Sequence, residues 1–301
     1  MDILKGPRSL HRWAVANLVA NMAIVWTGAL VRLTKSGLGC PTWPQCDAGS
    51  YVPHPEAEWH AFIEFGNRLL TFVLIAIALG TAITVFRTVR ARRVRMLSIL
   101  IGLGIGLQGV VGGLTVLSQL NPWVVGLHMV LSVGLIVACV TVVHDAFELR
   151  PEPAPRRLWL AAQAVFWLSL LMMYAGTVVT GAGPHSGDGA AQRNGFDLSE
   201  VARVHSVTMW ITLAVTVWLA YAARGVRRVR RAALLVIGTA CLQAVIGYTQ
   251  YLTHLPMGMV FAHMVGTTLY TVAISHLWLS AVPEAQKISG STAAARKTTA
   301  R

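Results

Sequence analysis

Hydrophobic residues form long uninterrupted runs along the chain, and short polar segments separate these runs. Each run is close to the roughly 20 residues that a helix needs to cross a bilayer. A spanning barrel would show alternating residues instead, whereas a helix satisfies its own backbone hydrogen bonds in lipid. We therefore predict an all-α polytopic membrane protein with eight transmembrane helices, at about residues 13–33, 61–86, 96–117, 124–144, 158–181, 201–223, 232–252 and 259–281.

One 23-residue stretch occurs twice. LQGVVGGLTVLSQLNPWVVGLHM recurs 135 residues later as LQAVIGYTQYLTHLPMGMVFAHM, with identical residues at nine positions (Leu, Gln, Val, Gly, Leu, Leu, Val, His and Met). The alignment pairs Gln108 with Gln243 and His128 with His263, which shared apolar composition alone would not do. An offset of four spans makes the copies parallel, so we expect two pseudo-symmetric parallel four-helix bundles.

The proline-rich segment RPEPAPRR marks a natural boundary between the two halves. We expect an N-terminal half over 1–149, a cytoplasmic linker over 150–157 and a C-terminal half over 158–281. The remaining 282–301 are rich in Ala, Ser, Thr and basic residues, which favours a disordered cytoplasmic tail.

Composition and charge support a membrane protein. The chain is 55% hydrophobic and only 12% charged, too apolar for one soluble core. Twenty of its 25 lysines and arginines fall on one side of the eight-span arrangement, and the positive-inside rule then places both termini in the cytoplasm of a cell-membrane protein. The net charge of +13 is therefore a topology signal and a contact for anionic lipids, and we expect no nucleic-acid partner.

The first outer loop begins TKSGLGCPTWPQC, and its Gly, Pro and Trp content predicts a compact turn-rich cap. Cys40 and Cys46 lie in this loop, outside the cytoplasm where disulfides persist, so we predict a bond between them. The sequence leaves open whether this bond is a structural staple or a redox-active pair.

Three polar residues share one face of the second span. Glu64, Asn67 and Arg68 are spaced i, i+3 and i+4, so their side chains lie near one another at membrane depth. Charges there are expensive and usually pair or serve a site. Two interpretations remain: an internal Glu64–Arg68 ion pair that fixes packing, or part of a functional site.

Four side chains are predicted at one level of the membrane. Asn67, His128, His205 and His263 each follow the start of a span that runs from outside to inside by about four to seven residues. Imidazole is a common ligand of heme iron, and two helices of a bundle can each offer one histidine to a macrocycle. Copper or zinc is an alternative, but carboxylates, thiolates or a third histidine to complete such a site are not supplied at this level.

Several motifs together resemble those of the heme A synthase family. They are GALVRLTKSGLGCPTWPQC, IEFGNRLL, GPHSGD and the paired LQ…G…HM segments, spread over residues 13–281. The resemblance implies an eight-helix protein of two similar halves with a b-type heme as cofactor. It also implies oxidation of the C8 methyl group of heme O to a formyl group, giving heme A for terminal oxidases. A heme O synthase and oxidase assembly proteins are the partners that follow.

The resemblance also implies roles for particular residues. His205 and His263 would ligate heme b in the C-terminal half, while the N-terminal half would hold the substrate heme. Glu64 would be the catalytic carboxylate, and the cysteines of the outer loop would form the disulfide.

The chain departs from the family's Glu-x-x-His-Arg pattern at one position. Asn67 stands where that pattern has histidine, while Glu64 and Arg68 are in register. We therefore expect His128 alone to hold the substrate iron, with water or a weak Asn67 contact opposite, and the propionates to lie near outer-loop donors or Arg68.

Two other functions use the same features. A diheme b-type cytochrome that carries electrons between quinone and an outer partner would need the same histidines. A transporter would suit a duplicated membrane protein, although the repeats here are parallel rather than inverted.

Overall fold

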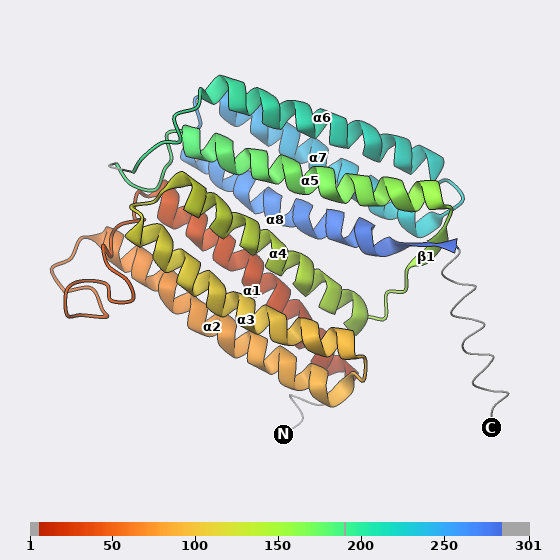
Figure 1. Ribbon diagram of the computed structural model, residues 1–301, viewed down its shortest axis with the longest axis horizontal. Coiled ribbons are helices and arrows are strands. Elements are labelled where there is room, and N and C mark those ends of the chain that lie inside the picture. The colour runs from red at the N-terminus through yellow and green to blue at the C-terminus, as the bar shows by residue number, and fades with distance from the viewer. Residues whose placement is uncertain (1–5, 190, 285–301) are drawn as a thin grey trace.

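The computed structural model describes residues 6–189 and 191–284, and it is built almost entirely of helices (Figure 1). All eight predicted spans are confirmed as helices long and apolar enough to cross a membrane, and two short strands accompany them. The elements are α1 Pro7–Leu33, α2 Trp59–Thr88, α3 Arg92–Leu117, α4 Pro122–Ala146, β1 Glu152–Ala154, α5 Arg156–Ala182, α6 Leu198–Ala222, α7 Arg227–Leu252, α8 Met257–Ser280 and β2 Ala281–Pro283.

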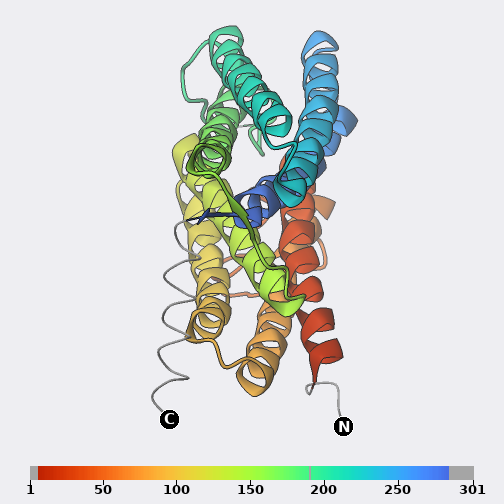
Figure 2. The same ribbon diagram turned by 90° about the vertical axis from the view of Figure 1, so that its right-hand side faces the viewer.

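The helices form two groups of four in chain order, which lie one above the other in Figures 1 and 2. Within each group every helix contacts the next one along the chain, and the fourth packs back on the first. Between the groups, α4 contacts α5 and α8, and α1 contacts α8. The first and fourth helix of each group therefore make the interface, as expected if the groups are related by an approximate two-fold axis.

Each group has its own hydrophobic core, and a smaller cluster joins the two. In a bilayer this packing supplies the attraction between helices, because lipid tails are as apolar as the side chains. Trp26 of α1 donates a hydrogen bond to the Thr268 hydroxyl of α8 (2.9 Å), and His144 of α4 is hydrogen bonded to His276 of α8 (2.8 Å). The clusters are centred on Leu74, Ile101, Ile105 and Val142 in the first group, Val165, Leu219, Val236 and Ile274 in the second, and Met22, Val25, Ile136 and Val140 between them.

The two turns that connect helices inside the duplicated stretch share an uncommon backbone conformation. Gln119 and Leu120 between α3 and α4 have φ of 52° and 58°, and His254 and Leu255 between α7 and α8 have φ of 63° and 60°. Left-handed backbone costs about 1–2 kcal/mol per non-glycine residue. Its recurrence at the same offset of 135 agrees with the predicted duplication.

The linker and the end of α8 pair as a short parallel sheet, which the sequence analysis did not expect. Glu152 lies opposite Ala281 in the register of β1 and β2. The tail was expected to be disordered from 282, whereas Val282 and Pro283 belong to β2; the rest of that expectation, from 285 on, lies outside the described residues. Strands this short and proline-rich carry no propensity signal, since proline normally weakens a strand.

Capping side chains fix the residues at which α4 and α6 begin. The Asn121 side chain accepts a hydrogen bond from the backbone amide of Trp123 at the start of α4. Asp197 accepts hydrogen bonds from Ser199 and from the Glu200 amide at the start of α6. These bonds, first of all the one from the Ser199 hydroxyl, lower the pKa of the Asp197 carboxyl. Both helices carry a site histidine one to two turns further on.

Candidate functional site

One continuous cavity of about 1110 Å³ reaches into both helix groups. All eight helices contribute to its wall, and its volume is slightly above the roughly 300–1,000 Å³ of ordinary ligand sites. Asn67, His128, His205 and His263 all line it, each six to eight residues after the first residue of its helix. The structure therefore brings the four predicted residues to one cavity.

In the second helix group two histidines face each other. The ring centroids of His205 and His263 are 6.5 Å apart, with an angle of 77° between the ring planes. His205 Nδ1 lies 2.9 Å from the Met172 carbonyl oxygen, to which it donates, so its Nε2 is left as the free ligand atom. A metal that bonds one nitrogen of each ring at about 2 Å fits between rings at this separation.

In the first helix group the side chain of Asn67, which lines the same cavity as His128, is already engaged. The Asn67 amide oxygen accepts a hydrogen bond from the Thr27 hydroxyl of α1 at 2.7 Å. An amide oxygen is a weak metal ligand, and this hydrogen bond occupies it further. Of the predicted ligand positions in this group, only His128 offers an imidazole.

The two groups support their α4 and α8 histidines in the same way. Gln108 donates to the His128 carbonyl oxygen at 3.1 Å, and Gln243 donates to the His263 carbonyl oxygen at 3.0 Å. Each glutamine also donates to a hydroxyl one turn further along the same helix. The glutamines that the duplication aligned therefore fix the backbone at each histidine.

Glycines leave room beside the histidine rings. A Cβ at Gly112 would lie 3.4 Å from the His128 ring, and a Cβ at the matching Gly247 would lie 3.4 Å from the His263 ring. A Cβ at Gly176 would come within 3.2 Å of the His205 ring. A side chain at Gly176 would therefore press on the His205 ring, and side chains at Gly112 and Gly247 would pack directly against the other two rings.

The histidines have unused hydrogen-bonding capacity. The Nδ1 atoms of His128 and His263 are buried without a hydrogen-bond partner in the described part of the chain. Buried polar atoms without partners are uncommon in native structures and call for an explanation. A ligand that bonds Nδ1 itself would satisfy these atoms, whereas a ligand on the opposite ring nitrogen would leave them unpaired. No group of three or more His, Cys, Asp or Glu side chains within the described ranges is placed to hold a metal ion by itself.

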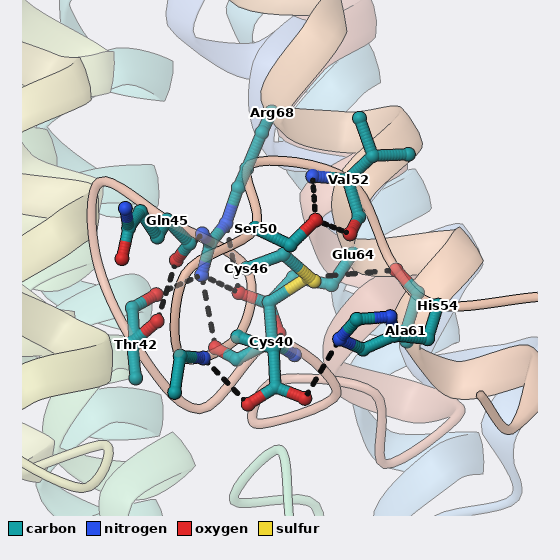
Figure 3. Close-up of a disulfide and its surroundings, with 12 residues drawn as sticks. Cys40, Thr42, Gln45, Cys46, Ser50, Val52, His54, Ala61, Glu64 and Arg68 are labelled. Carbon is teal, nitrogen blue, oxygen red and sulfur yellow. Dashed lines mark hydrogen bonds and ion pairs between the residues drawn. A yellow bond between two sulfur atoms is a disulfide. The ribbon is translucent and has the colours of Figure 1, made fainter.

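Glu64 and Arg68 form the predicted i, i+4 ion pair, and both line the cavity (Figure 3). Arg68 Nη2 lies 2.5 Å from Glu64 Oε1, while Glu64 Oε2 accepts a hydrogen bond from the Cys40 amide at 2.8 Å. The guanidinium also donates to the carbonyl oxygens of Cys40, Thr42 and Gln45. Glu64 is only 5% exposed. The pair thus fastens the first outer loop to α2 and holds one carboxylate rigidly in the cavity wall.

The Cys40–Cys46 disulfide is confirmed (Figure 3). The loop that it closes forms part of the cavity wall. Trp43 and Pro44, between the two cysteines, line the cavity. Trp43 packs so closely on α3 that a Cβ at Gly113 would lie 2.3 Å from its indole ring. The turn-rich segment is therefore the compact cap that its composition predicted.

The third outer loop is fastened to the first helix group. Arg32 of α1 donates to the carbonyl oxygens of Thr180 (2.9 Å) and His185, and His185 Nε2 lies 2.8 Å from the Leu255 carbonyl oxygen, to which it donates. The Gly37 amide donates to the Gly187 carbonyl oxygen at 3.0 Å. His185 therefore holds the loop in place and does not join the histidines of the cavity.

Comparison with known protein families gives a match over most of the chain. Residues 11–274 match the model of COX15-CtaA, described as cytochrome oxidase assembly protein. The chain belongs to this family. The COX15-CtaA match includes all eight site residues expected from the sequence, from Cys40 to His263, and it makes the chain a multi-pass membrane protein.

Curated relatives of this COX15-CtaA member carry one name. The chain is 28% identical to the heme A synthase of Azorhizobium caulinodans, over 89% of the chain and 93% of that protein. It is 28% identical to the heme A synthase of Rhodopseudomonas palustris, over 89% of each. It is 31% identical to that of Lysinibacillus sphaericus, over 57% of the chain and 58% of the relative. The first two alignments include both helix groups.

Sequence reasoning missed three contributors to the site: Thr27, which bonds Asn67, and Trp43 and Gly176, which line the cavity. Thr27 had no local signal, because a threonine in an apolar span commonly bonds its own helix. Trp43 was assigned to the cap but not to the cavity wall. Gly176 could have been found, since Gly112 and Gly247 match in the repeat and a third glycine before a histidine helix fits the same pattern.

Proposed function

We propose that this protein is a heme A synthase, which oxidises the C8 methyl group of heme O to a formyl group and so makes heme A for terminal oxidases. The family and the full-length relatives support this activity. The observation that carries it is the cavity in which His205 faces His263 while His128 and Glu64 lie in the same wall. Such a reaction needs a cavity large enough for heme, side chains that ligate its iron, and one fixed carboxylate.

The cofactor in this proposal is heme b, held by His205 and His263. The ring separation and the free Nε2 of His205 suit axial ligation of one iron. A bis-histidine heme supplies one-electron transfer. Gly176 and Gly247 keep both rings accessible.

The substrate heme O would bind in the first helix group, with His128 as its iron ligand. The Thr27 hydrogen bond keeps Asn67 away from ligation, so the substrate is held from one side. A single protein ligand suits a molecule that has to leave as product. In this arrangement residues 1–149 form the substrate half, 158–281 the heme b half, 150–157 the linker and 282–301 the tail.

Glu64 is the catalytic carboxylate of the proposal. In the cavity wall it would stabilise positive charge that develops beside the macrocycle, or accept a proton from water that attacks the oxidised methyl carbon. Arg68 acts as a positioning residue, because its hydrogen bonds go to Glu64 and to the carbonyls of the outer loop. Of the two expected partners of the propionates, outer-loop donors or Arg68, these bonds favour the outer-loop donors.

The proposed location is the cell membrane with both termini in the cytoplasm. The first and third outer loops and the disulfide would then face outside, and the basic inner loops would contact anionic lipids. A heme O synthase and oxidase assembly proteins are the proposed partners, and nucleic acid is not.

The decisive experiment identifies the hemes that cells make with and without this protein. Cells that supply heme O should contain heme A only when the protein is present, as shown by chromatography of extracted pigments. The Glu64→Gln variant, which keeps the hydrogen bond to the loop, should accumulate heme O or an alcohol intermediate. An unchanged pigment profile with heme still bound would instead assign the protein as a diheme b-type cytochrome.

A further inference from the structure

Three polar side chains meet on the exposed side surface of the second helix group, between α6 and α7. The Ser206 hydroxyl lies 2.7 Å from the Tyr248 hydroxyl, and the Trp210 indole nitrogen donates to the same Tyr248 oxygen at 2.9 Å. We call Ser206, Trp210 and Tyr248 the α6–α7 polar trio. Its surroundings are apolar and exposed, with Val207 at 51% and Val245 at 66%. Because these helices span the membrane, the trio faces lipid.

One hydroxyl hydrogen of the trio is not used in the hydrogen bonds among its three side chains. The Trp210 indole donates to Tyr248, and one further hydrogen bond joins the two hydroxyls. Whichever hydroxyl donates in that bond, the hydrogen of the other has no acceptor among the described residues. In hydrocarbon, where water is scarce, an unpaired hydroxyl hydrogen is costly. The trio therefore offers a hydrogen bond to a neutral acceptor that arrives through the membrane.

The trio also borders the histidine cavity. Ser206 directly follows His205, and Tyr248 directly follows Gly247, whose added Cβ would touch the His263 ring. Ser206 and Tyr248 line the cavity themselves. A ligand at the trio would thus lie between the lipid and the paired histidines.

The first helix group has nothing of this kind. The residue after Asn67 is Arg68, whose hydrogen bonds go to Glu64 and the outer loop, and the residue after Gly112 is Gly113, which Trp43 covers. The duplicated fold therefore does not require a polar trio on the second group, and packing alone does not explain it.

We propose that the α6–α7 polar trio binds the head group of a membrane quinone, with a quinone carbonyl oxygen accepting the unpaired hydroxyl hydrogen. Trp210 and Tyr248 supply aromatic faces for a flat ring. The proposal rests on the proposed function, because oxidation of a methyl to a formyl group needs an electron acceptor. One methyl group, one water and two quinones give one formyl group and two quinols, which balances atoms and electrons. A phospholipid ester offers the same carbonyl chemistry but accepts no electrons.

The test titrates the purified full-length protein with menadione and, in parallel, decylubiquinone, and follows quenching of tryptophan fluorescence. Loss of one neutral hydrogen bond of about 1 kcal/mol should weaken quinone binding about fivefold in Tyr248→Phe. Ser206→Ala should weaken it to a similar extent, and Trp210→Phe should remove much of the quenching. Tyr251→Phe, which removes a hydroxyl from the same helix outside the trio, should bind as the unaltered protein does.

Two outcomes would overturn the site. One is that all four variants bind both quinones with the same affinity as the unaltered protein. The other is a solvent extract of the purified protein that contains phospholipid only, together with no quenching by either probe. The heme A content of the same cells separates this proposal from the function: heme A without quinone binding rejects the trio alone, whereas quinone binding without heme A rejects the synthase activity.

Discussion

The two histidine sites of this protein stand on equivalent helices and yet differ in what they offer. In the second group, the ring centroids of His205 and His263 are 6.5 Å apart. The positions that match Glu64 and Arg68 are occupied there by the uncharged Ala202 and Ser206. In the first group, His128 shares the cavity wall with an Asn67 amide that is bonded to Thr27 and with the Glu64–Arg68 ion pair. One site is equipped to hold a metal from both sides, and the other to hold it from one side next to a charge.

The comparison shows which parts of a duplicated site stay the same and which change. The glutamines and glycines that support the α4 and α8 histidines are the same in both groups. The differences are concentrated on α2 and α6, where Glu64, Asn67 and Arg68 correspond in register to Ala202, His205 and Ser206. Under the proposed function, these differences on α2 and α6 are what separate the heme b site from the substrate site.

The largest effect is expected from removing a paired histidine. His263→Ala leaves one ligand and an enlarged cavity, so bound heme per protein should fall several-fold, as measured by the absorbance of the purified protein. His54→Ala, in the exposed outer loop, should keep its full heme content. Unchanged heme content in the His263 variant would remove this residue from the ligand set.

The second largest effect is expected on stability, from the first group alone. Arg68→Ala leaves a buried Glu64 unpaired and removes the loop's carbonyl partners, which should cost about 3–5 kcal/mol. Thermal unfolding in detergent measures this, and Arg203→Ala, an exposed arginine on the same cavity, is the control. In Glu64→Ala/Arg68→Ala the loss should be smaller than the sum of the two single losses, and a strictly additive result would mean that the pair does not interact.

A more direct test makes the first site resemble the second. Asn67→His adds an imidazole opposite His128 and gives up the hydrogen bond to Thr27, worth about 1 kcal/mol. The variant should retain heme more firmly in the first group, seen as a second low-spin signal by electron paramagnetic resonance, and should release product more slowly. Thr27→Val frees Asn67 without adding an imidazole and should give no second signal.

The smallest effect is expected at the glutamines that both helix groups share. Gln108→Leu and Gln243→Leu each remove an interhelical polar contact, which in membrane proteins is worth about 0.6–2 kcal/mol. The two variants should therefore lose similar, small amounts of thermal stability. A much larger loss for one of them would show that the shared scaffold is not equally important in both groups.

The amino-acid sequence by itself determined the features that are local or repeated. Eight helices follow from eight apolar runs, because in lipid each span must satisfy its own backbone. The Glu64–Arg68 pair follows from a spacing of four residues, the Cys40–Cys46 bond from a short loop, and the duplication from aligned residues 135 positions apart.

Only the tertiary structure decided the contacts between distant elements. It joined the two histidine sites in one cavity, bonded Thr27 to Asn67, directed Arg68 to the loop carbonyls, paired β1 with β2 and assembled the α6–α7 polar trio. Each of these depends on how helices are rotated and how closely they approach one another. Many combinations of side chains pack an apolar helix equally well, so hydropathy alone does not fix that rotation.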